Sequence, residues 1–84
     1  MKVGVLVNAN AGRHAGRDRL SARYREAGAL VLPTRSLDEL PAAVAELAAA
    51  GVDRVALSGG DGSIHRGLTA LARHWPGELP PLAF

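Results

Sequence analysis

Three glycines surround a single aspartate in the stretch Gly59-Gly60-Asp61-Gly62, directly after an apolar run. Ile64, Leu68 and Leu71 follow at helical spacing, so the sequence predicts a strand, a tight turn and a helix. Adjacent glycines at the end of a strand permit unusual backbone angles and leave no Cβ to obstruct a ligand. The main-chain amides that open the helix can then point toward an anion, supported by the helix dipole. The stretch therefore predicts a phosphate-binding turn.

The aspartate of this stretch has several possible roles. In an ordinary turn without a ligand, Asp61 would cap the helix. In a phosphate site its negative charge must be offset, and three roles make physical sense. It could hold Mg²⁺ directly or through water, accept a proton from an attacking hydroxyl, or bond to the amides of its own turn. A phosphate cradle beside a carboxylate fits phosphoryl transfer better than dinucleotide binding, since the Rossmann and Walker glycine motifs are absent.

Two further loops carry candidate ligand contacts. The small-residue loop from Asn8 to Gly16 follows the first apolar run, and both Asn8 and Asn10 can accept backbone hydrogen bonds. Arg13 in this loop could balance phosphate charge. Thr34 follows the second apolar run, where the residues alone are equally consistent with a simple turn or cap hydroxyl.

Alternating apolar runs and amphipathic stretches predict the elements that position these loops. Leu20 and Tyr24 place one apolar face on the first helix, and Ser36 with Glu39 forms a capping-box pattern for the second. Leu37, Leu40, Val44 and Leu47 form the apolar stripe of that second helix. We expect strands at 2–8, 29–32 (closed by Pro33), 54–58 and 82–84, and helices at 17–27, from the capping box to 50, and from the glycine turn to about 74.

The order β-α-β-α-β-α-β, with short connections, predicts the fold class α/β. We expect a parallel, doubly wound (Rossmann-like) three-layer half-domain that stops after its fourth strand. Ligands of such sheets bind outside the carboxyl ends of the strands, near a topological switch point. The loops after the first three strands carry all the candidate contacts, so they are expected at one edge of the sheet.

Composition narrows the function classes further. Eighty-four residues suffice for one small domain, and the absence of cysteine excludes disulfides and thiolate metal sites. A net charge of +2 does not indicate a nucleic-acid partner. No apolar run approaches the ~18–20 residues of a transmembrane segment, and the run after Lys2 is too short for a signal peptide. We expect a cytoplasmic protein that would reach any lipid substrate at a membrane surface.

Two motifs resemble those of a known superfamily. The stretch from Gly59 to Ile64 is similar to the Gly-Gly-Asp-Gly-Thr signature of diacylglycerol kinases, sphingosine kinases and NAD kinases. The opening from Val5 to Gly12 resembles the Val-Asn-Pro-x-Ala-Gly loop of the lipid-kinase branch. The motifs stand in the family's order at about its spacing, and the resemblance covers about the first quarter to third of such an enzyme. Residues 1–84 are thus expected to be the incomplete N-terminal nucleotide-binding part of a diacylglycerol-kinase-like catalytic domain.

The resemblance implies a reaction and a set of contacts. Enzymes of this superfamily use Mg²⁺ and transfer the γ-phosphoryl group of ATP to a hydroxyl, here a lipid alcohol such as diacylglycerol. The cleft lies between this α/β domain and a β-rich second domain. The resemblance places Asp61 in the active site as the catalytic candidate. It assigns nucleotide contacts to Asn8, Ala9, Asn10, Ala11, Gly12, Thr34, Gly59, Gly60, Asp61, Gly62, Ser63, Ile64 and His65.

Several positions depart from the family pattern. Ala9 replaces the usual proline, and Ser63 replaces threonine while keeping the hydroxyl. His65 stands where asparagine is usual, and Arg66 stands where many lipid kinases have glutamate. An arginine after the motif also resembles NAD kinases, whereas the Val-Asn-x-x-Ala-Gly opening favours a lipid kinase.

The family's next nucleotide motif and its second domain would lie past Phe84. We therefore expect the ATP-binding portion of a lipid kinase that does not turn over by itself and whose open sheet edge favours self-association. Two alternatives remain: an NAD-kinase-like phosphotransferase fragment, and a non-catalytic nucleotide- or anion-binding module. The acceptor substrate is not encoded in these residues.

Overall fold

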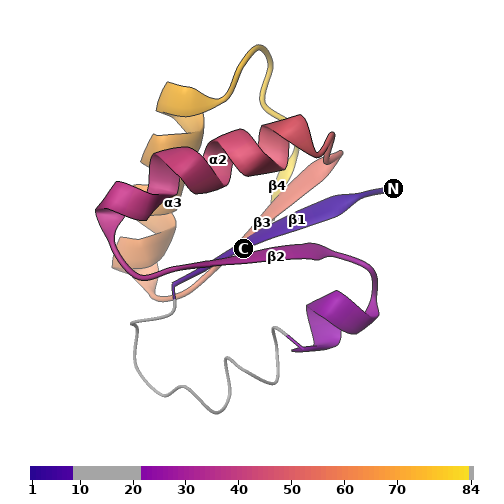
Figure 1. The fold of residues 1–84 in the computed structure, drawn as a ribbon. Helices are drawn as coiled ribbons and strands as arrows, with labels where there is room; N and C mark the ends of the chain where they lie inside the picture. Colours follow the sequence, from indigo (N-terminus) through magenta and orange to yellow (C-terminus); the bar gives the residue numbers. More distant parts are fainter. Residues whose placement is uncertain (9–21, 84) are drawn as a thin grey trace.

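The computed structural model describes residues 1–8 and 22–83 (Figure 1). Residues 22–26 form a short helical turn, and the 3₁₀ helix η1 (Leu37–Glu39) lies directly before α2 (Leu40–Ala49). The remaining elements are the strands β1 (Val3–Asn8), β2 (Leu30–Thr34), β3 (Arg54–Ser58) and β4 (Leu82–Ala83), and the helix α3 (Asp61–His74).

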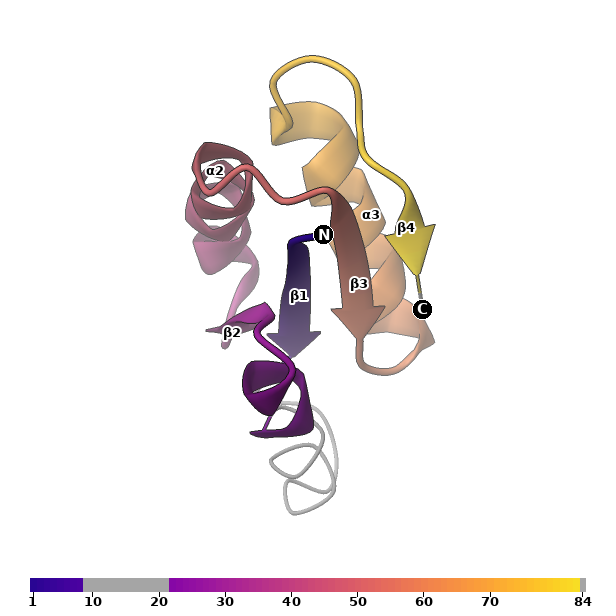
Figure 2. The ribbon, with the colours of Figure 1, turned by 90° about the vertical axis from the view of Figure 1, so that its right-hand side faces the viewer.

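The four described strands form one parallel sheet in the order β2-β1-β3-β4, which confirms the predicted doubly wound α/β fold. Val5 of β1 pairs with Val31 on one side and with Ala56 on the other. The chain leaves β1 toward β2 and later returns to β3 on the opposite flank, so the switch point lies between β1 and β3. In Figure 2 the arrowheads of β1, β3 and β4 point the same way.

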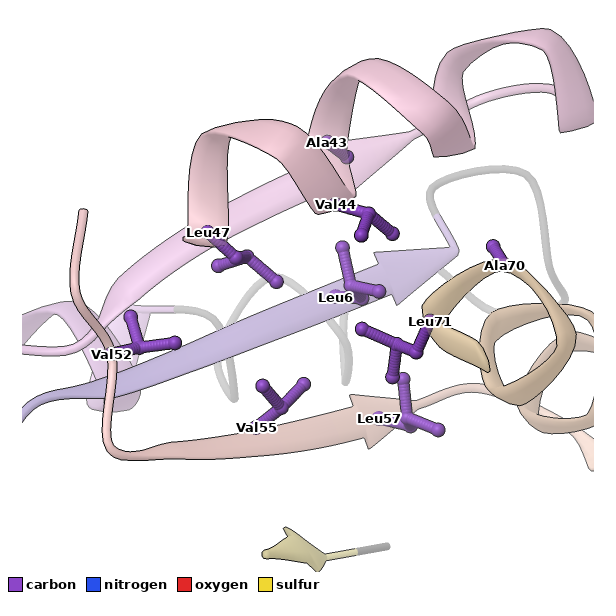
Figure 3. Packing of buried hydrophobic residues seen from close by; sticks show 9 residues of the cluster. All are labelled: Leu6, Ala43, Val44, Leu47, Val52, Val55, Leu57, Ala70 and Leu71. Atoms are coloured by element: carbon purple, nitrogen blue, oxygen red, sulfur yellow. The ribbon is translucent and has the colours of Figure 1, made fainter. Parts of the chain in front are cut away.

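The helices α2 and α3 lie on the same face of the sheet and contact each other. The larger part of the core lies between these two helices and the sheet (Figure 3). Leu47 of α2, Leu71 of α3 and Val55 of β3 are fully buried there. Burying each such side chain contributes about 1.5–3 kcal/mol. The cluster consists of Leu6, Ala43, Val44, Leu47, Val52, Val55, Leu57, Ala70 and Leu71.

The opposite face of the sheet carries a smaller cluster of Val5, Val7 and Val31, against which Tyr24 of the 22–26 turn packs. Successive side chains of a strand point to opposite faces, and β1 has apolar partners on both. This explains why β1 reads as a continuous apolar run. Tyr24 faces the sheet as predicted, while Leu20 lies outside the described residues.

Two details of the second strand and its exit differ from the sequence-based prediction. Pro33 lies within β2, opposite Val7, and does not close the strand. A proline lacks the N–H that a central strand needs, but β2 is at the edge of the described sheet, where proline is tolerated. The capping box is absent: Ser36 makes no side-chain cap, and the carboxylate of Glu39 accepts the N–H of Arg35 at 2.8 Å.

The predicted apolar stripe of the second helix is only partly correct. Val44 and Leu47 are buried, but Leu37 belongs to η1 and is 59% exposed. The chain passes through a 3₁₀ turn before α2 begins, which rotates Leu37 off the face that the later residues bury. The predicted end is confirmed, because Gly51 adopts a φ of 71° just after the cap residue Ala50.

Gly4 tests how tightly α2 packs on β1. A Cβ at Gly4 would collide with Cδ2 of the fully buried Leu47 and lie 3.1 Å from Cγ1 of Val52. We expect Gly4→Ala to lower the free energy of unfolding by about 1–3 kcal/mol, measured by chemical denaturation. Gly62→Ala is the matched control, since its Cβ would meet only Arg66 Nη1 at 3.9 Å, and it should leave stability unchanged or raised. Equal stability of wild type and Gly4→Ala would contradict the packing.

Candidate functional site

The carboxyl ends of three adjacent strands bring the predicted loops to one edge of the sheet. Asn8, the last residue of β1, pairs in register with Thr34, the last residue of β2. Val7 pairs with Ser58, which ends β3 just before the glycine turn. Asn8, Thr34 and the glycine turn therefore meet beside the switch point, where ligands of such sheets bind.

Gly59 is required by the turn itself. Its φ of 152° is a conformation that residues with a side chain rarely adopt. A Cβ at Gly59 would lie 2.7 Å from Cβ of Ser63 and 3.5 Å from Cβ of Asn8. The absence of a side chain lets β1, β3 and the first turn of α3 approach one another.

Gly60 and Gly62 have no such internal reason to be glycine. Gly60, the N-cap residue of α3, has ordinary extended angles, and a Cβ there would meet no atom of residues 1–8 or 22–83 within 4 Å. A Cβ at Gly62 would find only Arg66 Nη1, at 3.9 Å. The backbone at both positions is thus open to an approaching group from outside the described chain.

The first turn of α3 presents main-chain donors without acceptors. The helical hydrogen bonds begin at Ile64, whose N–H donates to the carbonyl of Gly60 at 3.0 Å. The N–H groups of Asp61, Gly62 and Ser63 have no hydrogen-bond partner among the described residues. Asp61 is exposed, and its carboxylate caps none of these amides. The capping role considered for Asp61 is therefore not the one the structure adopts.

Side-chain hydrogen bonds link the end of β1 to the end of β2 and to the first turn of α3. The Asn8 side-chain amide donates a hydrogen bond to the hydroxyl of Ser63, which links β1 to the first turn of α3. Thr34, 8% exposed, directs its hydroxyl toward the Val7 carbonyl across a long 3.5 Å contact. Asn8 and Thr34 thus stabilise the carboxyl edge of the sheet through their hydrogen bonds.

A hollow of about 360 Å³ opens beside this edge, between the start of α3 and the segment after β2. Its size lies within the range of small-ligand sites. It is lined by Asn8, Thr34, Arg35, Ser36, Leu37, Leu40, Ser63 and Arg66.

Sequence reasoning missed five of these lining residues. Arg66 could have been found from helical periodicity, because it lies three residues after Ser63 and so shares its face of α3. Arg35 and Ser36 follow Thr34 directly, but no pattern indicated that their segment folds over the edge. Leu37 and Leu40 were instead assigned to a buried stripe.

Some predicted contacts lie elsewhere. The candidate contacts Ala9, Asn10, Ala11 and Gly12 are outside the described residues. Ile64 packs against the main core and its N–H is already bonded within the helix. His65 is exposed and lines a different groove, along α3.

Metal ligands of the usual protein kind are not gathered at this edge. Across residues 1–8 and 22–83, no group of three or more His, Cys, Asp or Glu side chains could hold a metal ion. Mg²⁺ is commonly bound by one or two carboxylates together with substrate phosphates. The exposed carboxylate of Asp61, beside three amides that have no partner within residues 1–8 and 22–83, fits that mode of binding and does not fit an all-protein metal cage.

Comparisons with known proteins agree with the fold and indicate a family. The family model of the diacylglycerol kinase catalytic domain matches residues 2–84. Among solved structures, the chain resembles the crystal structure of a candidate diacylglycerol kinase from Bacillus anthracis str. Sterne, with a TM-score of 0.70 and 24% sequence identity. The match covers 96% of this chain and 29% of that protein, and at this identity it shows a shared fold. No curated protein sequence matches the chain.

The two kinds of glycine in the turn should separate by stability. Gly59→Ala should lower the free energy of unfolding by about 1–3 kcal/mol, because it combines an unfavourable φ with a clash against Ser63. Gly60→Ala should leave it unchanged, since its Cβ enters open space. Thermal unfolding followed by circular dichroism measures both. Equal destabilisation by the two substitutions would contradict the turn geometry.

Proposed function

Because the chain belongs to the diacylglycerol kinase catalytic domain family, we propose that it is the ATP-binding, N-terminal portion of an ATP-dependent lipid kinase. Such an enzyme transfers the γ-phosphoryl group to a lipid hydroxyl such as that of diacylglycerol. The observation that carries the proposal is a set of three amides at the start of α3 that have no partner in the described parts of the chain, beside a hollow at the carboxyl edge of the sheet.

The phosphate tail of ATP is proposed to bind at the first turn of α3. The N–H groups of Asp61, Gly62 and Ser63 would donate to phosphate oxygens, and the positive end of the helix dipole would add to their attraction. The open space at Gly60 allows the phosphate to approach the backbone closely. Phosphoryl transfer depends mainly on such positioning and charge stabilisation, so main-chain donors can supply a large part of it.

The rest of the nucleotide is proposed to lie in the 360 Å³ hollow. Arg35 and Arg66 line it from two different elements and would offset the negative charge of the ligand. Ser63 receives the hydrogen bond of Asn8 as an acceptor, which leaves its own hydroxyl hydrogen to donate to a phosphate oxygen. The predicted contacts Asn8, Thr34 and Ser63 keep their assignment in this proposal.

Asp61 is proposed to act in the chemistry. Its carboxylate is exposed at the first residue of α3 and bonds none of the turn amides, which leaves the two reactive roles. It would hold Mg²⁺ beside the phosphates, or accept the proton of the attacking hydroxyl. Mg²⁺, when bound, neutralises charge on the phosphates; the role of this chain is to place the carboxylate next to them.

The lipid acceptor would be met at a membrane surface. Within the described parts of the chain, no helix is both long and apolar enough to cross a bilayer. We propose a cytoplasmic location with peripheral contact to the membrane, since a lipid hydroxyl is presented at the bilayer surface.

Gly60→Val tests the phosphate-binding turn. A branched side chain at this open position would occupy the space proposed for the phosphate, so MgATP binding should be lost while thermal stability is retained. Gly60→Ala should weaken binding by a smaller factor. Isothermal titration calorimetry that finds the same MgATP affinity in wild type and Gly60→Val would remove the assignment.

Asp61→Asn tests the carboxylate separately. If Asp61 helps to hold Mg²⁺, wild type should bind ATP more tightly with Mg²⁺ than without it, and Asp61→Asn should abolish most of that difference. Affinity for ATP without Mg²⁺ should stay equal or rise, because a negative charge beside the phosphates is removed. A Mg²⁺ effect of unchanged size in the variant would leave proton acceptance as the role of Asp61.

A further inference from the structure

A second hollow, of about 430 Å³, runs along the outer side of α3 next to the start of α2. It shares the lining residues Leu37, Leu40 and Arg66 with the 360 Å³ hollow of the candidate site, here called the nucleotide hollow, so the two hollows adjoin. We call this second hollow the basic groove. The basic groove lies outside the glycine turn, and of the predicted nucleotide contacts that the structure describes, only His65 lines it.

The wall of the basic groove is cationic. Arg66 and Arg73 line it together with His65 and His74, and all four side chains are exposed on α3. No carboxylate of the described residues lines the groove. The nearest acidic residues in sequence belong to η1, where the Glu39 carboxylate is engaged with the Arg35 N–H.

The remainder of the basic groove is apolar. Leu40, Pro41 and Ala70 line it, and Leu37 stands at its rim with 59% of its surface exposed. Leu37 and the terminal Met1 are the exposed large hydrophobic side chains among the described residues. A single exposed leucine is ordinary, but here it adjoins an apolar floor and two arginines. The surface therefore combines the two properties of a membrane-interface element, an apolar contact and adjacent cations.

We propose that the basic groove docks this face of the protein on a bilayer that contains anionic lipids. Leu37 would enter the boundary between headgroups and acyl chains, and Arg73, which lines only the basic groove, would face lipid phosphates. The choice of a membrane as partner rests on the proposed function, whereas the preference for anionic lipid rests on the charge of the groove. Because Arg66 also borders the nucleotide hollow, docking would place the bilayer surface beside the phosphate-binding turn.

Vesicle co-sedimentation tests the docking. The chain should bind vesicles of phosphatidylcholine mixed with phosphatidylglycerol, and bind pure phosphatidylcholine vesicles much less. Arg73→Gln should weaken binding to the mixed vesicles about fivefold, the factor that corresponds to about 1 kcal/mol per arginine near an anionic surface. Leu37→Ser should also weaken it. Added salt should reduce the difference between wild type and Arg73→Gln.

Arg54→Gln is the matched control, because it removes the same charge from an exposed arginine. Arg54 begins β3, whereas the candidate site lies at the carboxyl ends of the strands. Arg54→Gln should bind mixed vesicles nearly as well as wild type. Equal losses for Arg54→Gln and Arg73→Gln would show an effect of net charge alone and overturn the proposal. Equal binding to both vesicle types would also overturn it.

Two further measurements separate this proposal from others. Arg73→Gln should bind ATP with wild-type affinity, because Arg73 does not line the nucleotide hollow. If the wild type bound vesicles but not ATP, the kinase proposal would be overturned and the membrane docking would stand. Analytical ultracentrifugation tests whether a second copy of the chain, rather than a bilayer, binds to the basic groove. A wild-type dimer that Leu37→Ser converts to monomer, with vesicle binding unaffected, would overturn the docking to membrane.

Discussion

The candidate site depends on three main-chain N–H groups at the start of α3 that find no acceptor among the described residues. Every α-helix begins with such orphan donors, and a side chain or water usually satisfies them. Here the cap residue is Gly60, which has no side chain, and Asp61 does not fold back over the turn. Because α3 follows β3 directly through the glycine turn, the sheet fixes the position of these donors. An anion at this point would gain hydrogen bonds that the protein does not make for itself.

The glycines of the turn serve two different physical purposes. Gly59 has the unusual φ and close contact with Ser63 that let three elements converge. Gly60 and Gly62 have neither, so the packing of the described residues does not require glycine there, whereas close approach of a ligand to the backbone does. The Asn8–Ser63 hydrogen bond fixes the same junction from the other side. Gly59 and the Asn8–Ser63 hydrogen bond therefore fix the conformation of the turn, whereas Gly60 and Gly62 leave its backbone open to a ligand. Substitutions at the two kinds of position can separate effects on stability from effects on binding.

The sequence was sufficient for the features that repeat along the chain. Apolar runs and helical spacing predicted the parallel sheet, the ends of α2 and α3, and the gathering of Asn8, Thr34 and Gly59 at one edge, because parallel strands end at the same edge. Features set by three-dimensional packing were not predictable in this way. Pro33 remains in a strand only because β2 is at an edge, and Leu37 is exposed because a 3₁₀ turn intervenes before α2. Arg35 lines the nucleotide hollow from the connection after β2, and no local pattern places that connection beside α3.

The most direct measurement is the amide spectrum of the ¹⁵N-labelled chain during a titration with MgATP and, in parallel, with inorganic triphosphate. Hydrogen bonding to an anion changes the chemical shift of the donor amide. The account predicts the largest changes at Asp61, Gly62 and Ser63 with both ligands, because both carry the same phosphate tail. Saturable changes confined to other parts of the chain, with these three amides unmoved, would contradict it.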